Sequence, residues 1–163
     1  MTDMWNKLVI LLNRTLVLYQ TLLESGRKKR AILTEADARQ LELLTNREDV
    51  LLIEAGKLEI ERVNLVQKIA ARLALNETSL SCLCQYADSE TAPKLKNLSG
   101  QLAQVTQELV KTNELNTKLI RQSLELINFN INLLSQSSVG PTYAPQGQSA
   151  ASAASRILLD AKV

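Results

Sequence analysis

Few residues in this chain are of the types that do chemistry. Among its 163 residues there is no histidine, so the commonest general base and metal ligand is missing, with every Ser-His or Cys-His nucleophile pair. The only cysteines, Cys82 and Cys84, are separated by a single residue. That spacing is too short for a structural disulfide, and two thiols are too few for a zinc site. We expect both to stay reduced and to serve packing.

The carboxylates do not suggest an active site either. The 17 acidic residues are spread along the chain, many of them near lysine or arginine, as on solvated helix surfaces. No glycine-rich phosphate loop and no metal-ligand spacing accompanies them. The sequence therefore predicts a protein that is not an enzyme and has no cofactor.

The nearly balanced charge of the chain does not indicate a partner that binds mainly through electrostatic attraction. Nucleic-acid binding proteins usually have a basic face, whereas 19 basic and 17 acidic residues nearly balance here, for a net charge of +2. We interpret the one basic cluster, Arg27-Lys28-Lys29-Arg30, as a solvated helix face or a bend beside Gly26. The alternative is a contact with phosphate or acidic lipid, as in a nucleic-acid or membrane-surface adaptor. We expect no nucleic-acid partner.

The leucine-rich stretch near the amino terminus is a candidate membrane or targeting segment. Between Leu8 and Leu23 it is interrupted by Asn13 and Arg14, and no cleavage-type sequence follows it. It is neither a transmembrane span nor a signal peptide by these criteria. We expect a cytoplasmic protein with no stable membrane insertion.

Composition and periodicity predict an all-α fold. Aromatic residues make up 3% of the chain, and 5 glycines with 3 prolines are too few for a sheet protein with many turns. Apolar residues recur at steps of three and four, which predicts an antiparallel, coiled-coil-like bundle of three long helices. A short helical segment before the third helix should cover the end of the bundle with Leu80, Leu83 and Tyr86. The long helices are expected from Thr2 to Leu33, Glu35 to Leu75 and Lys94 to Ser138.

Several details of the first two helices follow from single residues. Gly26 allows either a bend or a continuous first helix. Thr34 should cap the second helix in a capping box that extends to Asp37. Within the second helix, Glu48 and Arg62 occupy apolar positions of the seam. Either they pair with neighbours or reach water, or they fix the helix register as buried polar groups.

The third helix is the expected functional element. Its apolar residues form one set from Leu95 to Leu109 and another from Ile120 to Leu134. Between the sets, polar residues from Thr112 to Asn116 stand where apolar residues are expected, and we interpret them as a break of phase. The first set should pack on the other helices, and the second should be available to a partner helix.

Beyond the third helix the composition changes. From Gly140 the chain is rich in Gly, Pro, Gln, Ser and Ala, which predicts a flexible tail over residues 140–163 after a helical domain over residues 1–139. The tail contains Tyr143 and the apolar patch Ile157-Leu158-Leu159. These are either a peptide recognition signal or segments that fold back on the bundle.

Three passages resemble the FlgN-type flagellar export chaperones. The tail sequence Tyr143-Ala144-Pro145-Gln146-Gly147 is close to the Tyr-Gly-Pro-Asp-Gly ending of that family, from which it departs at Ala144 and Gln146. The other two passages are Leu16-x-x-Tyr19-x-x-Leu22-Leu23-x-x-x-x-Lys28-x-x-Ala31-Ile32, followed by Asp37 and Leu41, and Leu58-Glu59-x-x-Arg62-x-x-Leu65.

The resemblance implies a cytosolic chaperone for the two hook-filament junction proteins, which prevents their premature assembly and delivers them for export. Tyr143 is the matching candidate for docking to the cytosolic domain of the export gate, and the export ATPase complex is a further candidate partner. The alternative is a structural coiled-coil protein that assembles with itself. In the family the carboxy-terminal helix holds the cargo, which implies cargo contacts at Leu119, Ile120, Leu124, Ile127, Ile131 and Leu134.

Overall fold

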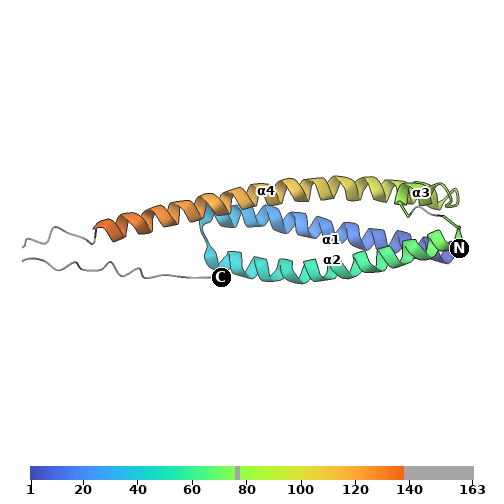
Figure 1. The fold of residues 1–163 in the computed structure, drawn as a ribbon, viewed down its shortest axis with the longest axis horizontal. Coiled ribbons are helices and arrows are strands. Elements are labelled where there is room, and N and C mark those ends of the chain that lie inside the picture. The colour runs from blue at the N-terminus through green and yellow to red at the C-terminus, as the bar shows by residue number, and fades with distance from the viewer. Residues whose placement is uncertain (76–77, 138–163) are drawn as a thin grey trace, which may run out of the picture. The chain divides into compact units, whose positions relative to one another are not determined.

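The structure is a computed structural model that describes residues 1–75 and 78–137. Within these ranges the chain forms helices and no strand, which confirms the predicted all-α fold class with three long helices. By contacts the chain divides into two compact units, Met1–Glu125 and Leu126–Val163. The helices are α1 (Thr2–Glu35), α2 (Ala38–Arg72), α3 (Leu80–Cys84) and α4 (Thr91–Ser137) (Figure 1).

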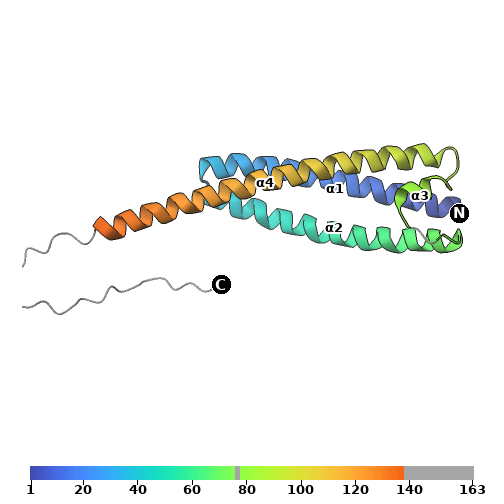
Figure 2. The same cartoon turned by 45° about the horizontal axis from the view of Figure 1, so that its top comes forward.

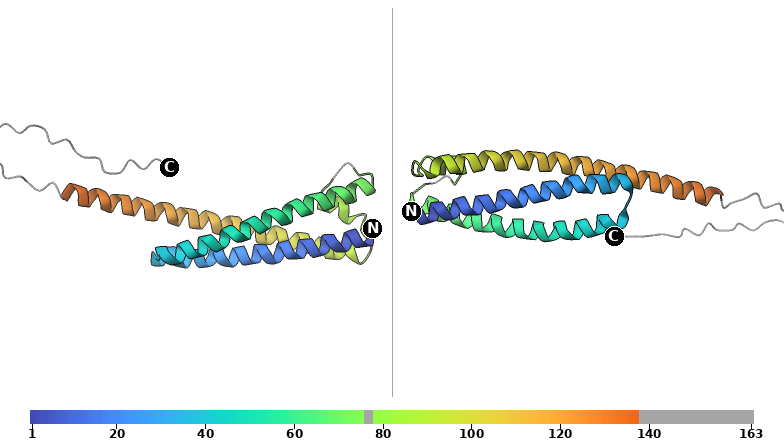
Figure 3. Two further views of the ribbon diagram at one scale, coloured as in Figure 1. Left: turned by 90° about the horizontal axis from the view of Figure 1, so that it is seen from below. Right: turned by 180° about the vertical axis from the view of Figure 1, so that it is seen from behind.

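In the first unit, α1 and α2 are antiparallel, and the part of α4 that belongs to this unit runs in the direction of α1 (Figures 1 and 2). The short helix α3 lies at the end of the bundle near Met1 (Figure 3). All four helices supply the main core, whose buried members are Trp5, Leu8, Leu12, Leu16, Val66, Ile69, Leu83, Leu95 and Leu98.

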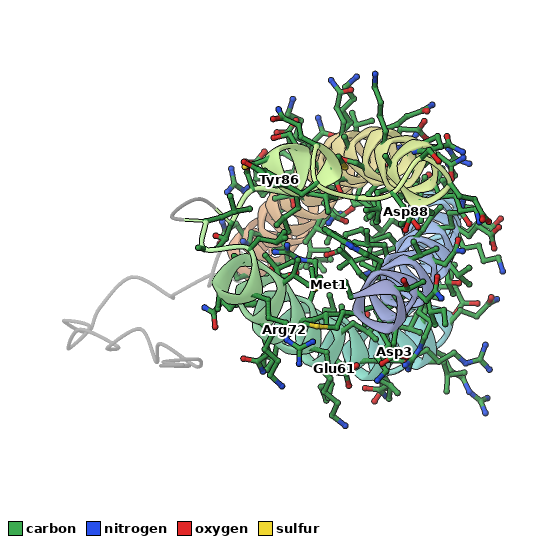
Figure 4. All side chains as sticks on the ribbon, turned by 90° about the vertical axis from the view of Figure 1, so that its right-hand side faces the viewer. Met1, Asp3, Glu61, Arg72, Tyr86 and Asp88 are labelled. Atoms are coloured by element: carbon green, nitrogen blue, oxygen red, sulfur yellow. The ribbon has the colours of Figure 1, made fainter. Side chains whose placement is uncertain are left out.

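A view along the helices shows how the predicted seams are used. Apolar side chains fill the space between α1, α2 and α4, while charged side chains such as Glu61 point outward (Figure 4). A second, smaller cluster of Leu11, Leu18 and Leu58 lies between α1 and α2 alone. Within the first unit, the main apolar stripes of α1 and α2 and the first apolar set of α4 are therefore buried or half-buried on the side that the sequence period predicts.

The turn between α1 and α2 differs from the prediction. Thr34 does not cap α2, because it lies in the last turn of α1 and donates its hydroxyl to the carbonyl of Arg30 at 2.9 Å. Asp37 caps α2 instead, accepting the backbone N–H of Gln40 at 2.9 Å and its side-chain amide at 2.8 Å. These hydrogen bonds hold the pKa of Asp37 below its ordinary value. The N-cap is thus Asp37, and α2 begins at Ala38 rather than Glu35.

The two polar residues in the seam of α2 are both paired. Glu48 accepts the hydroxyl of Ser25 at 2.8 Å and pairs with Lys29, so its partners lie on α1. Arg62 holds Glu59 on its own helix through two hydrogen bonds of 2.6 and 2.8 Å. This fork-shaped contact lowers the pKa of Glu59. Glu48 and Arg62 therefore both pair with neighbouring side chains, which is one of the two predicted outcomes.

The end of the bundle is closed mainly by Leu83, which is fully buried. Leu80 and Cys84 pack around this core, and burial raises the pKa of the Cys84 thiol. Tyr86 is half exposed, so the prediction that it covers the bundle end is wrong. The chain turns at this point, and Ala87 packs in its place. Both cysteines are free thiols.

Candidate functional site

The polar residues in the middle of α4 belong to its packing face. Thr112 and Asn116 are 7% and 3% exposed, and they continue the steps of three and four from Leu109 to the half-buried Leu119. The predicted break of phase is therefore wrong. Polar residues occupy packing positions here. The packing face of α4 therefore continues through Thr112 and Asn116 with the same repeat of three and four residues.

A close approach of α1 and α4 explains why these positions are polar and small. Asn116 Nδ2 donates to the carbonyl of Gly26 at 2.8 Å in a buried hydrogen bond. A Cβ atom at Gly26 would lie 2.9 Å from Thr112 Cγ2, closer than carbon atoms pack. Glycine at residue 26 therefore lets the two helices touch, and α1 passes through it as a continuous helix. Asn116 Oδ1 is buried without a hydrogen-bond partner among the described residues.

The same contact fixes how α1 lies along α4. Asn116 follows Gly26 by 90 residues in the sequence, and the two helices run in the same direction. Helices rise equally per residue, so Glu35, the last residue of α1, lies roughly level with Glu125. The first unit ends at that residue as well.

The basic cluster near Gly26 takes part in the bundle. Arg27 Nη2 lies 2.8 Å from Glu108 Oε2 on α4, and Lys29 pairs with Glu48 on α2. The Nε atom of Arg30 is buried. Two of the four cations, Arg27 and Lys29, are therefore paired with carboxylates of the bundle, which favours a structural role of this cluster over an adaptor surface.

The six predicted cargo residues differ in their exposure and in the unit to which they belong. Leu119 is half-buried, while Ile120 and Leu124 are exposed on the last turns of the first unit. Ile127, Ile131 and Leu134 lie in the second unit, where their exposed fractions are 52%, 53% and 70%. Five of the six predicted residues are therefore exposed, large apolar side chains.

The prediction missed three further apolar residues of the second unit. Leu126, Phe129 and Leu133 are also exposed and lie on a different face of α4. Their own spacing of three and four in the sequence was the signal that could have identified them. From residue 126 to residue 137 the sequence contains no charged residue, and every described side chain from 124 to 135 is exposed.

The first unit also has shallow grooves. One lies between α1, α2 and α4 and includes Tyr19, Leu22, Leu52 and Val110. Others follow the outer side of the α1–α2 pair, where Ile10 and Arg14 are shared by two neighbouring hollows. These grooves mix charged and apolar side chains, whereas the apolar surface of the second unit is uncharged.

Two predicted features lie outside the described residues. They are Tyr143, the candidate for docking to the export gate, and the patch Ile157-Leu158-Leu159. The expected domain boundary at residue 140 lies there as well.

The described part of the chain contains neither a candidate metal site nor a candidate membrane span. Over residues 1–75 and 78–137, no group of three or more His, Cys, Asp or Glu side chains is placed to hold a metal ion. None of the described helices is both long enough and apolar enough to cross a membrane.

Comparison with family models gives one match. The model described as "FlgN protein" matches residues 1–151, which is nearly the whole chain. The chain belongs to the FlgN family. Its members are flagellar export chaperones that bind flagellar substrate proteins, and they are not known as enzymes. The resemblance predicted from the sequence is confirmed. Comparisons with curated proteins and with solved structures gave no match.

Proposed function

We propose that this chain is a cytoplasmic chaperone for the two hook-filament junction proteins. It holds an unassembled junction protein through the exposed end of α4, prevents premature assembly and delivers its cargo to the export gate. The observation that carries this proposal is the exposure of large apolar side chains, Ile127 and Ile131 among them, on a segment without charge. A helix with apolar side chains over much of its circumference is normally buried, so this segment favours a partner helix.

The first unit gives α4 a fixed support. The contact of Gly26 with Thr112 and Asn116 holds α4 against α1 shortly before the exposed segment begins. A binding helix that is already ordered loses little conformational entropy when its partner docks. The cargo segment has to be ordered on binding, at a cost of about 2–5 kcal/mol, and this cost helps to keep the complex releasable.

The proposed cargo site comprises the six residues inferred from the family resemblance. Leu119 lies at the margin, where its half-buried side chain joins the packing face of the bundle. The remaining five provide exposed apolar surface: Ile120, Leu124, Ile127, Ile131 and Leu134.

Delivery is proposed to use the segment after α4. Tyr143 follows Ser137, the last residue of α4, by six positions, so it is connected to the cargo site by a short stretch of chain. We propose that Tyr143 docks to the cytosolic domain of the export gate, with the export ATPase complex as a further candidate partner.

A second candidate function is a self-assembling coiled coil, because the same exposed apolar segment would also pair with copies of itself. Sedimentation of the free chain and of its mixture with a purified junction protein distinguishes the two. The chaperone proposal expects a small species whose size does not depend on concentration, and a discrete complex when the junction protein is added. Growth of the free chain into larger species, with no complex in the mixture, would favour self-assembly.

A further inference from the structure

The described part of the second unit has two apolar faces. At 3.6 residues per turn, Ile127 and Ile131 lie on one face, which Leu134 extends by a turn. We call it the first face. Leu126, Phe129 and Leu133 lie about 130° further around the helix at this repeat, and we call them the second face.

Both faces are exposed. On the second face the exposed fractions are 61% for Leu126, 58% for Phe129 and 48% for Leu133. With about 200 Å² for a large side chain that is fully exposed, the second face offers roughly 300 Å² of apolar area. The first face offers a similar area. Asn128 and Asn132 occupy the remaining, polar side of the helix.

One docked helix does not cover both faces. A helix presents an apolar stripe about 100° wide to its neighbour, and the centres of the two faces are further apart than that. A single helix on the first face would leave the second face in water.

The available area also argues against a simple dimer of this chain. A two-fold dimer that used one face of each copy would bury roughly 300 Å² of this segment per copy, whereas a stable interface buries about 800 Å² per partner. Such a dimer would also leave the other face of each copy exposed. With both faces covered, the area approaches the standard size, more than half of which is apolar.

We propose that the flagellar substrate protein covers α4 from two sides, with two amphipathic helices of one substrate chain, one on each face. This inference rests on the proposed function, since it specifies the form of the substrate segment that the chaperone binds. Because the segment from residue 126 to residue 137 is uncharged, the substrate helices meet it through uncharged faces. Binding at this segment therefore depends little on salt.

The decisive experiment places a photo-crosslinking residue on each face of the full-length chain, which is then mixed with a purified, full-length hook-filament junction protein. The variants are Phe129→p-benzoylphenylalanine for the second face and Ile131→p-benzoylphenylalanine for the first. The matched control is Asn128→p-benzoylphenylalanine on the polar side. Mass spectrometry of the linked peptides identifies the partner segments.

We expect residues 129 and 131 to link to two different helices of the junction protein, and residue 128 to link much less. Links from both positions to the same substrate helix would overturn the inference. Links from residue 129 to a second copy of this chain, or from residue 131 alone, would overturn it as well. If the unmodified chain binds no junction protein in solution, it is the proposed function that fails, and the inference falls with it.

A second experiment measures how much the second face contributes to the affinity for the junction protein. The triple variant Leu126→Gln, Phe129→Gln and Leu133→Gln keeps good helix-forming residues and removes the second face. We expect it to weaken junction-protein binding by about tenfold or more, while Asn128→Gln with Asn132→Gln leaves the affinity unchanged. Unchanged affinity in the triple variant would show that the second face is not covered by the substrate.

Discussion

The two units use the same helix in opposite ways. In the first unit, α4 buries polar residues, Thr112 and Asn116, against α1. In the second unit it exposes large apolar residues such as Ile127 and Phe129. Residue type alone therefore does not decide burial along α4. The polar residues are buried because a helix of the same unit lies against them and supplies a hydrogen-bond acceptor.

The comparison assigns different roles to the two units. The first unit has a complete core, with residues from all four helices, and serves as a support. The second unit has apolar surface of the kind that a core uses, and no described residue of it is buried. Surface of this kind on a family member that binds substrate proteins is best explained by a partner. Stability and binding should accordingly respond to different residues.

The largest expected effect is a loss of stability from the first unit. Leu8 is fully buried in the core, so Leu8→Ala should lower the free energy of unfolding by about 2–5 kcal/mol. Ile131→Ala, on the exposed segment, should change it by no more than about 0.5 kcal/mol. Urea unfolding followed by circular dichroism measures both. A similar loss in the two variants would mean that Ile131 is covered in the free chain.

The next effect tests the close approach of α1 and α4. Gly26→Ala places a methyl group against Thr112 Cγ2, which should destabilise the chain by about 1–3 kcal/mol, less the helix propensity gained, at most about 1 kcal/mol. At Gly100 a Cβ would meet no atom within 4 Å. The matched Gly100→Ala should therefore be neutral or stabilising by up to about 1 kcal/mol.

The cause of that loss is tested by a second substitution. Thr112→Ser removes the methyl group that the new Cβ would meet, so the double variant Gly26→Ala with Thr112→Ser should recover part of the lost stability. A double-mutant cycle gives the coupling free energy between the two sites. Additive effects would show that the helices do not press together at this point.

A smaller effect, on secretion of the junction proteins, is expected from a substitution of Tyr143. Tyr143→Ala should leave stability and junction-protein binding unchanged but reduce secretion of the junction proteins several-fold. The control is Tyr86→Ala, which removes a half-exposed tyrosine of the first unit and should leave secretion unchanged. Secretion into the culture medium is the measurement. Equal secretion by both variants would remove Tyr143 from the delivery step.

The smallest effect concerns the cap of α2. The pKa of Asp37 lies below its ordinary value of 3.8, because Gln40 donates to its ionised carboxylate. Its contribution to stability is therefore complete above pH 3.8 and is lost as the pH falls through the lower, folded-state pKa. The side-chain oxygen of an asparagine accepts the same hydrogen bond from the backbone N–H of Gln40, and asparagine does not titrate.

Asp37→Asn should thus fold normally at neutral pH and show a weaker loss of stability in acid than the parent chain. Thermal unfolding midpoints measured from neutral pH down to strongly acidic pH provide the comparison. Identical acid profiles for the two proteins would mean that the carboxylate of Asp37 does not stabilise the folded state.

Most of the fold could be predicted because it rests on periodicity. Steps of three and four placed each long helix within three residues of its observed start and end, and they identified the seam of α2 that contains Glu48 and Arg62. The cap of α2 was misassigned because Thr34-x-x-Asp37 and Asp37-x-x-Gln40 both resemble capping boxes. Which of them is used depends on where the chain turns, and the sequence does not determine that.

The candidate site was harder to predict for two reasons. In the sequence, Thr112 and Asn116 suggest a break because the positions of a helix seam are normally apolar. Their burial depends on Gly26, which lies 90 residues before Asn116, and nothing local in the sequence links the two. The second face has the same spacing of three and four at Leu126, Phe129 and Leu133, but the family resemblance implies contacts on the first face alone.

The central claim is that the exposed end of α4 binds the junction proteins, and calorimetric titration tests it most directly. The variant Leu124→Asp with Ile131→Asp is compared with Val50→Asp and Ile60→Asp, which place the same charges on exposed apolar positions of α2. We predict that the α4 variant no longer binds a purified junction protein, that the α2 variant binds like the parent chain, and that circular dichroism shows equal helix content. Full binding by the α4 variant would contradict the claim.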